Sequence, residues 1–152
     1  MVKARLRLAV ATLRDTRELE QVLEELAQAG VDDTDICLVA GEGHLAEPPL
    51  APGHRRARLT ATVVPIAAGT DAGRVMATSG PLARRFLEAT EDETAPLAGM
   101  LVHWLPERLA RELGDHVDRG GLLLWVQVRD GTEEQRACTV LLKHSQVRVH
   151  DI

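Results

Sequence analysis

The chain has 152 residues and a mass of 16.6 kDa, a length at which one domain can bury a substantial core. Its net charge of -5 and its aromatic content of 2% argue against nucleic-acid binding, because the chain offers neither a positive field nor a platform for stacking bases. Hydrophobic residues make up 45% of the chain, with one Phe and no Tyr, so we expect an aliphatic core.

The sequence contains no apolar run of about 18 residues that would span a membrane. The N-terminal apolar stretch ends at Arg14 and Asp15, too early for a secretory signal. Cys37 and Cys138 lie in apolar surroundings without a CxxC pair, which favours reduced, buried thiols. We therefore expect a cytoplasmic protein without a membrane span.

Residues 1–40 are expected to form a strand, a helix and a second strand. In "VKARLRLAV" apolar and basic residues alternate, the period of a strand with one buried face. Asp15 is the expected N-cap of the helix, with Glu18 three positions later; Gly30 ends it. "DICLVAG" is a short apolar strand. The expected apolar stripe of the helix consists of Leu19, Val22, Leu23, Leu26 and Ala27.

The same pattern returns 115 residues further on, in residues 120–152. Asp130 and Glu133 occupy the places of Asp15 and Glu18, between a strand in "GLLLWVQV" and another in "QVRVHDI". Two such βαβ units can pair their strands into one sheet with both helices on one face. We therefore predict an α+β fold with a ferredoxin-like sheet and a helical insertion between the units.

Residues 41–119 are read as a loop and helical insertion within a single domain. Residues 41–57 are rich in Pro and Gly, which indicates an exposed connection. Residues 59–66 fit either an edge strand that tolerates Pro65 or a helical segment. Short helices are expected after Gly80, from Pro96, and from Pro106 to near Gly120. Trp104 and Trp125 are expected in the core.

Three stretches, "VATLRDTRELEQVLEELAQAGVDDTDICLVA", "ATSGPLARRF" and "LPERLARELGDHVDRGGLLLWVQV", resemble the bacterial general-stress or heat-induced-stress protein family. The three stretches together contain 65 of the 152 residues. It supports the two outer βαβ units and carries no catalytic residues. Many members have a glycine-zipper middle suited to membrane association, whereas this middle is rich in arginine, which argues against insertion. These arginines are Arg55, Arg56, Arg58, Arg74, Arg84 and Arg85.

Candidate ligand-binding residues are arginines, because a guanidinium binds oxyanions in a bidentate manner. "HRRAR" contains His54, Arg55, Arg56 and Arg58; it is either an anion site or a solvated loop, and the acidic chain favours the loop. Arg14 and Arg129 could form a second polar site at the end of the sheet, although helix capping is the simpler role of the neighbouring aspartates.

No catalytic or metal site is predicted. The i,i+4 pairs His103 with Glu107 and Glu112 with His116 lack the two-histidine HExxH pattern, so surface pairing is favoured over metal binding. The glycine-containing "GEGH" and "GTDAG" read as turns rather than phosphate loops. No cofactor is expected.

Three functional hypotheses follow from these patterns. The first is a non-enzymatic, stress-associated binding or assembly protein, expected as a homodimer through a sheet face or edge and able to bind a protein partner. The second is a sensor of an anionic metabolite, with a ligand in the crevice between the repeat sheet and the inserted helices. The third is an enzyme, a hypothesis to abandon if no cleft contains converging ionisable groups.

Overall fold

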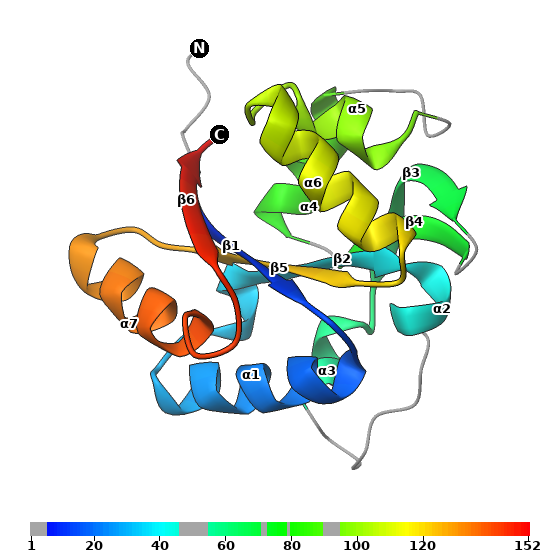
Figure 1. Cartoon of the computed structure of the whole chain (residues 1–152). Coiled ribbons are helices and arrows are strands. Elements are labelled where there is room, and N and C mark those ends of the chain that lie inside the picture. Colours follow the sequence, from blue (N-terminus) through cyan, green and yellow to red (C-terminus); the bar gives the residue numbers. More distant parts are fainter. Residues whose placement is uncertain (1–5, 46–54, 71–72, 79, 90–94) are drawn as a thin grey trace.

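The structure is a computed structural model of the chain that describes residues 6–45, 55–70, 73–78, 80–89 and 95–152. Within these residues, six strands form one antiparallel sheet with helices on both faces (Figure 1). The α+β class predicted from the sequence is confirmed. The central strands are apolar on both faces, so helices must bury each face, and the fold has three layers: helices, sheet and helices.

The elements follow one another in an order that begins and ends with a strand–helix–strand unit. They are β1 (Arg7–Leu13), α1 (Thr16–Gln28), β2 (Ile36–Gly41), α2 (Glu42–Leu45), α3 (Arg55–Leu59), β3 (Val63–Thr70), β4 (Gly73–Thr78), α4 (Pro81–Ala89), α5 (Leu97–Leu101), α6 (Glu107–Asp118), β5 (Leu122–Gln127), α7 (Gly131–Leu141) and β6 (Val147–Asp151).

The strand order is β3-β4-β2-β5-β1-β6. The two outer units therefore interleave: β5 lies between β2 and β1, and β1 lies between β5 and β6. Leu13 pairs with Leu122 and Leu8 with Gln127, so β1 and β5 run in opposite directions. β6 pairs only with β1 among the described strands and forms one edge of the sheet.

The repeated helix starts are real caps with the same geometry. The Asp15 carboxylate accepts a hydrogen bond from the Glu18 amide at 2.9 Å, and the Asp130 carboxylate accepts one from the Glu133 amide at 2.8 Å. Each glutamate accepts in turn from the backbone amide that precedes the capping aspartate. Gly30, with a φ of +85°, ends α1 in the left-handed region that favours glycine.

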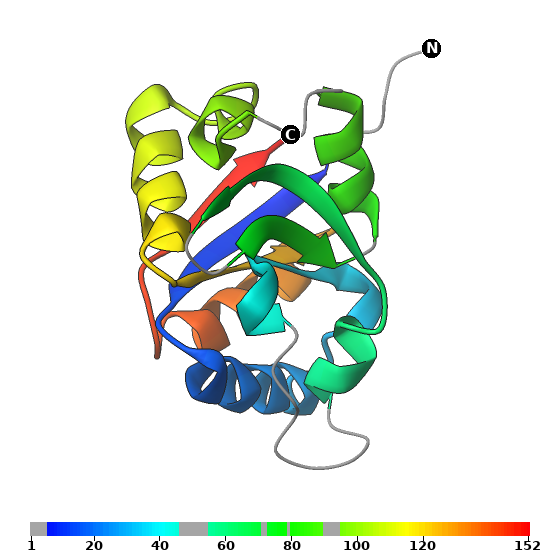
Figure 2. The same cartoon turned by 90° about the vertical axis from the view of Figure 1, so that its right-hand side faces the viewer.

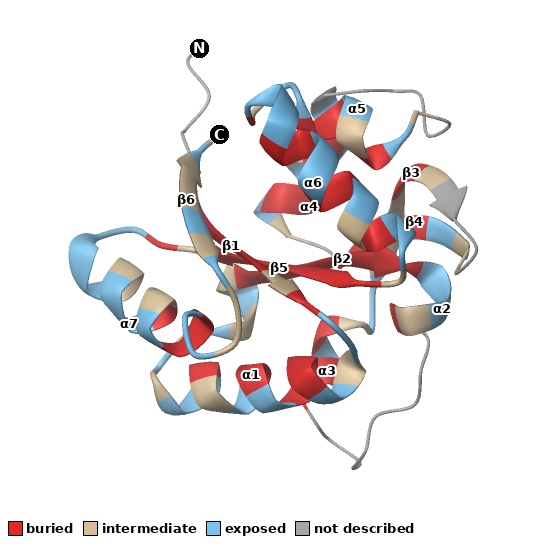
Figure 3. Cartoon of the chain, in the orientation of Figure 1, coloured by how far each residue is buried: buried red, intermediate tan, exposed pale blue. Residues whose placement is uncertain are grey.

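Two hydrophobic clusters lie on the two sides of the sheet. One lies under α1, α3 and α7, and the other under α4, α5 and α6. Figure 3 shows that the central strands between the two clusters are buried. Along β1, Leu8 and Val10 enter the cluster under α4–α6, whereas Ala9 and Leu13 enter the other. The prediction of one buried face is therefore incomplete for β1, because the inserted helices cover its second face.

The aromatic residues pack together in the cluster under α4–α6. Trp125 is fully buried, with its ring edge-to-face against Phe86 at 6.2 Å between centroids. Trp104 packs against the same phenyl ring at 5.1 Å and is only half-buried. Both tryptophans therefore serve core packing, as expected.

The insertion between the outer units is not only loop and helix. Within it, β3 and β4 form a hairpin that extends the sheet beyond β2 (Figure 2). The ambiguous stretch 59–66 divides between the two readings, since helix α3 ends at Leu59 and β3 begins at Val63. Pro65 lies on this edge strand beside a register irregularity, where its missing amide is tolerated.

Candidate functional site

Arg14 and Arg129 do not form one site. They follow β1 and β5, which are antiparallel, so they lie at opposite ends of the sheet, roughly 25 Å apart along the strands. Arg14 pairs with Glu18 at 2.9 Å, and Arg129 pairs with Asp35 at 2.7 Å. These hydrogen bonds raise the pKa of both arginines. The idea of a shared polar site at one sheet end is wrong because it overlooked strand direction.

The basic segment at 54–58 forms helix α3 rather than a free loop. Arg56 is 3% exposed and pairs with Glu20 at 2.9 Å. Arg55 donates to Asp33 and to backbone carbonyls, including that of Leu23 at 3.1 Å. His54 lies outside the described residues. Both arginines therefore fasten α3 to α1 and to the turn before β2.

Asp33 receives a second arginine from α3, since the exposed Arg58 donates to it at 3.1 Å. Partial burial alone raises the pKa of Asp33, but hydrogen bonds from Arg55 and Arg58 outweigh that effect and lower it. A ligand role for these arginines stays a prediction, and an anion would have to replace the acids that now hold them.

A groove lies between α6 and the β1–β6 side of the sheet, with a volume of about 450 Å³. It opens on the same face as the α4–α6 helices, in the crevice for which the sequence suggested a ligand. We call it the α6 groove. It is lined by Val10, Thr12, Leu109, Glu112, Leu113, Asp115, His116, Arg119, Gln146 and Arg148.

The periodicities of a helix and two strands build the groove. On α6, Leu109 and Leu113 are buried in the core, and polar residues on the adjoining stripe reach the opening. On β1, the alternation that buries Val10 puts Thr12 on the same face. Arg148 pairs with Val10 across β1 and β6, so its side chain extends the groove wall on the same face.

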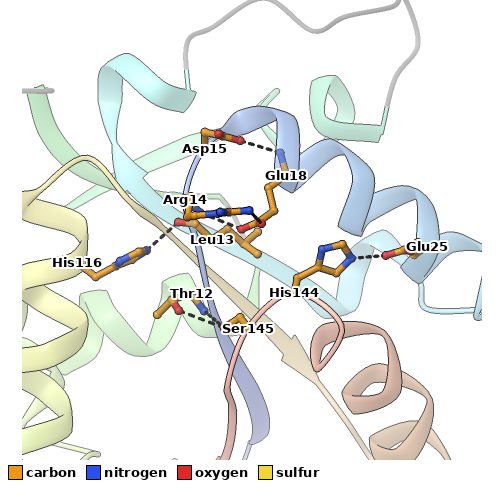
Figure 4. Close-up of polar contacts among 9 residues, drawn as sticks. All are labelled: Thr12, Leu13, Arg14, Asp15, Glu18, Glu25, His116, His144 and Ser145. Carbon is orange, nitrogen blue, oxygen red and sulfur yellow. Dashed lines mark hydrogen bonds and ion pairs between the residues drawn. The ribbon is translucent and has the colours of Figure 1, made fainter.

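His116 fixes α6 to the end of β1. Its Nε2 lies 2.8 Å from the carbonyl oxygen of Leu13 (Figure 4). A carbonyl can only accept, so Nε2 carries the proton and donates. Gly121 leaves the space that the imidazole occupies, because a Cβ there would overlap the ring. Packing against His116 therefore requires glycine at position 121.

The groove border at residues 144–146 is held by hydrogen bonds. Ser145 Oγ accepts from the Thr12 amide at 3.1 Å, lies 3.1 Å from Thr12 Oγ1, and donates to the Gln146 carbonyl at 2.8 Å. His144 contacts the Glu25 carboxylate on α1 (Figure 4). Ser145 donates its only hydroxyl proton to the Gln146 carbonyl, so the Thr12 hydroxyl is the donor in the bond between the two hydroxyl groups. His116 bonds to the Leu13 carbonyl and to neither of these hydroxyl groups.

Arg119 and Arg148 differ from the predicted arginines in their pairing. Across the described ranges, neither side chain forms a hydrogen bond or ion pair with the protein. Both are exposed at the α6 groove. Burial, and then the nearby Arg148 charge, lower the pKa of His150 on β6. The groove thus presents two guanidinium groups that a ligand can reach without displacing an acid.

The expected histidine–glutamate surface pairs do not form in the described structure. Glu107 pairs with Arg111, Glu112 pairs with Arg108, and His116 bonds to the backbone. Among the described residues, no group of three His, Cys, Asp or Glu side chains could hold a metal ion.

From the sequence, Glu112 and His116 were named only as a surface pair, and Thr12, Arg119 and Arg148 were missed, because clusters were sought along the chain. A signal was present: in "QVRVHDI" alternation leaves Gln146, Arg148 and His150 on one strand face, and Thr12 interrupts the apolar face of β1. The groove contains converging ionisable groups. The condition for abandoning the enzyme hypothesis, a structure without such a cleft, is therefore not met.

In the described part of the chain, no helix combines the length and apolar character that crossing a bilayer requires. No family model matches the chain, and neither a curated protein nor a solved structure matches it.

Proposed function

We propose that this protein is a non-enzymatic binding protein and that the α6 groove holds a small ligand with a carboxylate or phosphate group. One observation carries this proposal: Arg119 and Arg148 line a cavity of about 450 Å³ and have no acid partner in the described structure. Guanidinium groups are suited to oxyanions. The volume lies within the range of about 300–1,000 Å³ that small-molecule sites occupy.

The rigid border of the groove supports binding. His116 joins α6 to β1, and Ser145 joins the last loop to Thr12. Both contacts are made between parts of the chain itself, which reduces the ordering that binding would require. This pre-organisation fits a site that recognises a ligand of defined shape.

The hydrogen bonds favour binding over catalysis. A nucleophilic hydroxyl needs a base within reach, whereas Ser145 bonds to Thr12 and a backbone carbonyl, and His116 bonds to the Leu13 carbonyl. An enzyme that uses His116, Glu112 or Asp115 as an acid or base is the alternative. Turnover of a ligand that binds the groove would favour it.

The test is a thermal-shift titration with inorganic phosphate and with short mono- and dicarboxylates. A ligand at about 100 times its Kd stabilises a protein by about 2.7 kcal/mol, which corresponds to roughly 5–10 °C in Tm at this size. Arg148→Ala and Arg119→Ala should reduce the shift. Arg17→Ala, an exposed arginine on α1 outside the groove, should leave it intact.

The proposal fails if no probe raises Tm, or if the Arg17→Ala variant loses as much response as the two groove variants. Circular dichroism of each variant separates a lost site from a lost fold. Since Arg119 and Arg148 are exposed and make no described pair, their removal should leave basal Tm within a few degrees of the unmodified protein.

A second candidate role is assembly into a homodimer through the edge strand β6. The favouring observation is that β6 has one described neighbour, β1, so its outer backbone groups are open to another strand. Light scattering at micromolar concentrations should give twice the chain mass. A monomeric mass across that range would remove this role, and binding of a different protein at the same edge would then be tested by partner capture.

We also propose that β6, β1, β5 and β2 with α1 and α7 form a ferredoxin-like core. Its support is the interleaved antiparallel order and the common hydrophobic cluster of the two helices. Membership in the general-stress family and a cytoplasmic location remain proposals that rest on sequence pattern. Induction of the protein by heat, measured by immunoblot of fractionated cells, tests both.

A further inference from the structure

The α6 groove carries charges of both signs. Asp115 and Arg119 lie one helical turn apart and form no ion pair, although Arg108 and Glu112, at the same spacing on the same helix, are 3.5 Å apart. Arg148 faces the groove from β6 and is likewise unpaired within the described chain. The Asp115 carboxylate and the two guanidinium groups are therefore available to a ligand, and the Glu112 carboxylate beside them is engaged in a surface pair with the exposed Arg108 that a ligand can replace.

The floor of the groove is apolar. Val10 of β1 and Leu109 and Leu113 of α6 line it and belong to the core beneath α4–α6. They are 4%, 7% and 5% exposed, so they present a fixed hydrocarbon surface. A ligand that fills the groove can place an aliphatic group on this floor while its charged groups reach the rim.

We infer that the ligand is a zwitterion of the amino-acid type, with a carboxylate toward Arg119 and Arg148, an ammonium toward Asp115 and Glu112, and an aliphatic side chain on the apolar floor. This inference rests on the proposed function of the groove and names its ligand class. The free amino acid and a short peptide share this chemistry, and the experiment below separates them.

Charge balance distinguishes a zwitterion from simpler ligands. In the lining, the carboxylates of Glu112 and Asp115 balance the guanidinium groups of Arg119 and Arg148, so these four side chains carry no net charge. A simple anion would be attracted by the two arginines but repelled by the two carboxylates. A simple cation would be attracted by the carboxylates but repelled by the arginines. A zwitterion can satisfy both sets of groups. Hydrogen bonds to an ammonium add affinity that a matched carboxylate without the amine cannot obtain.

The experiment compares ligands that share one hydrocarbon body. Calorimetric titrations use L-leucine, 4-methylpentanoate, which lacks the ammonium, and 3-methylbutylamine, which lacks the carboxylate. L-Valine, L-isoleucine, L-methionine and the dipeptide L-leucyl-L-leucine extend the series. We expect at least one zwitterion to bind about tenfold more tightly than its matched carboxylate, the factor expected for one charge-assisted hydrogen bond. The amine should bind weakest.

Variants assign the two charged ends. Asp115→Asn combined with Glu112→Gln should remove the zwitterion's tenfold advantage and leave the carboxylate's affinity equal or higher. Arg148→Ala should weaken both ligands. Asp118→Asn is the control, because Asp118 is exposed on the same helix and does not line the groove. A preference for the dipeptide over every free amino acid would identify a peptide as the source of the zwitterion.

The outcomes separate this inference from the proposed function. If 4-methylpentanoate binds as tightly as every zwitterion, or if the double variant keeps the tenfold preference, the zwitterion inference is wrong and the anion site stands. If no carboxylate or zwitterion binds, the zwitterion inference is wrong, and the anion site stands only if inorganic phosphate raises Tm. If the amine alone binds best, both are wrong. A zwitterion preference that disappears in the double variant and persists in Asp118→Asn supports both.

Discussion

The ion pair between Arg56 and Glu20 gives the sharpest stability prediction. It joins α3 to α1, its atoms are 2.9 Å apart, and its side chains are 3% and 5% exposed. Arg56→Met removes the positive charge and leaves the Glu20 carboxylate in a buried place. Loss of one partner of a buried pair costs about 3–5 kcal/mol. At roughly 2–4 °C per kcal/mol for a chain of this size, Tm should fall by about 6–20 °C.

The double variant Arg56→Met with Glu20→Leu tests the cause of that loss. A buried ion pair replaced by apolar residues of similar volume is often neutral or stabilising, so the double variant should recover most of the stability lost in the single one. Arg58→Met is the control. It lies on the same helix, pairs with Asp33 at the surface and is 59% exposed, so its change should stay within about 1 kcal/mol.

Urea unfolding followed by circular dichroism measures all of these variants. The reasoning is refuted if Arg56→Met loses less than about 1 kcal/mol, because the buried carboxylate would then need no charged partner. It is also refuted if the double variant is as unstable as the single one, since the loss would then come from side-chain packing rather than from loss of the ion pair.

Asp15→Ala and Asp130→Ala should each lower the free energy of unfolding by about 1 kcal/mol through loss of a helix cap; urea unfolding that matches the unmodified protein would contradict the repeated cap. Gly121→Ala should cost about 1–3 kcal/mol by overpacking, because the new methyl group meets the imidazole of His116; combination with His116→Ala should recover part of this in thermal unfolding. Burial raises the pKa of Cys37 to about 12, so at pH 8 iodoacetamide should label this thiol only after denaturation, and a labelled peptide from native protein would contradict it.

The two outer units could be predicted from the sequence because the signals for each helix and strand lie within the element or next to it in the chain. Alternation, an aspartate cap and a terminal glycine identified α1, and alternation with an aspartate cap identified α7 between β5 and β6. The β3–β4 hairpin was harder to predict. Its first strand contains Pro65 and pairs with register irregularities, and both features weaken the simple period of two.

The candidate site was predicted less well because it depends on distant contacts. Arg56 looked like part of a solvated loop, since nothing near it in the chain indicates that Glu20 would face it in the core. The α6 groove joins Thr12, His116 and Arg148, which the sequence separates widely. Only the antiparallel pairing of β1 with β6 and the packing of α6 over the sheet bring them together.

The position of β1 in the sheet has a consequence for synthesis on the ribosome. β1 is the first described strand to be made, yet its two neighbours, β5 and β6, are the last two. At about 5–20 residues per second, β1 waits roughly 5–20 s after its own translation before β5 emerges. Throughout that interval its apolar residues lack their native partners, so β1 can form its native pairs only after β5 and β6 have been synthesised.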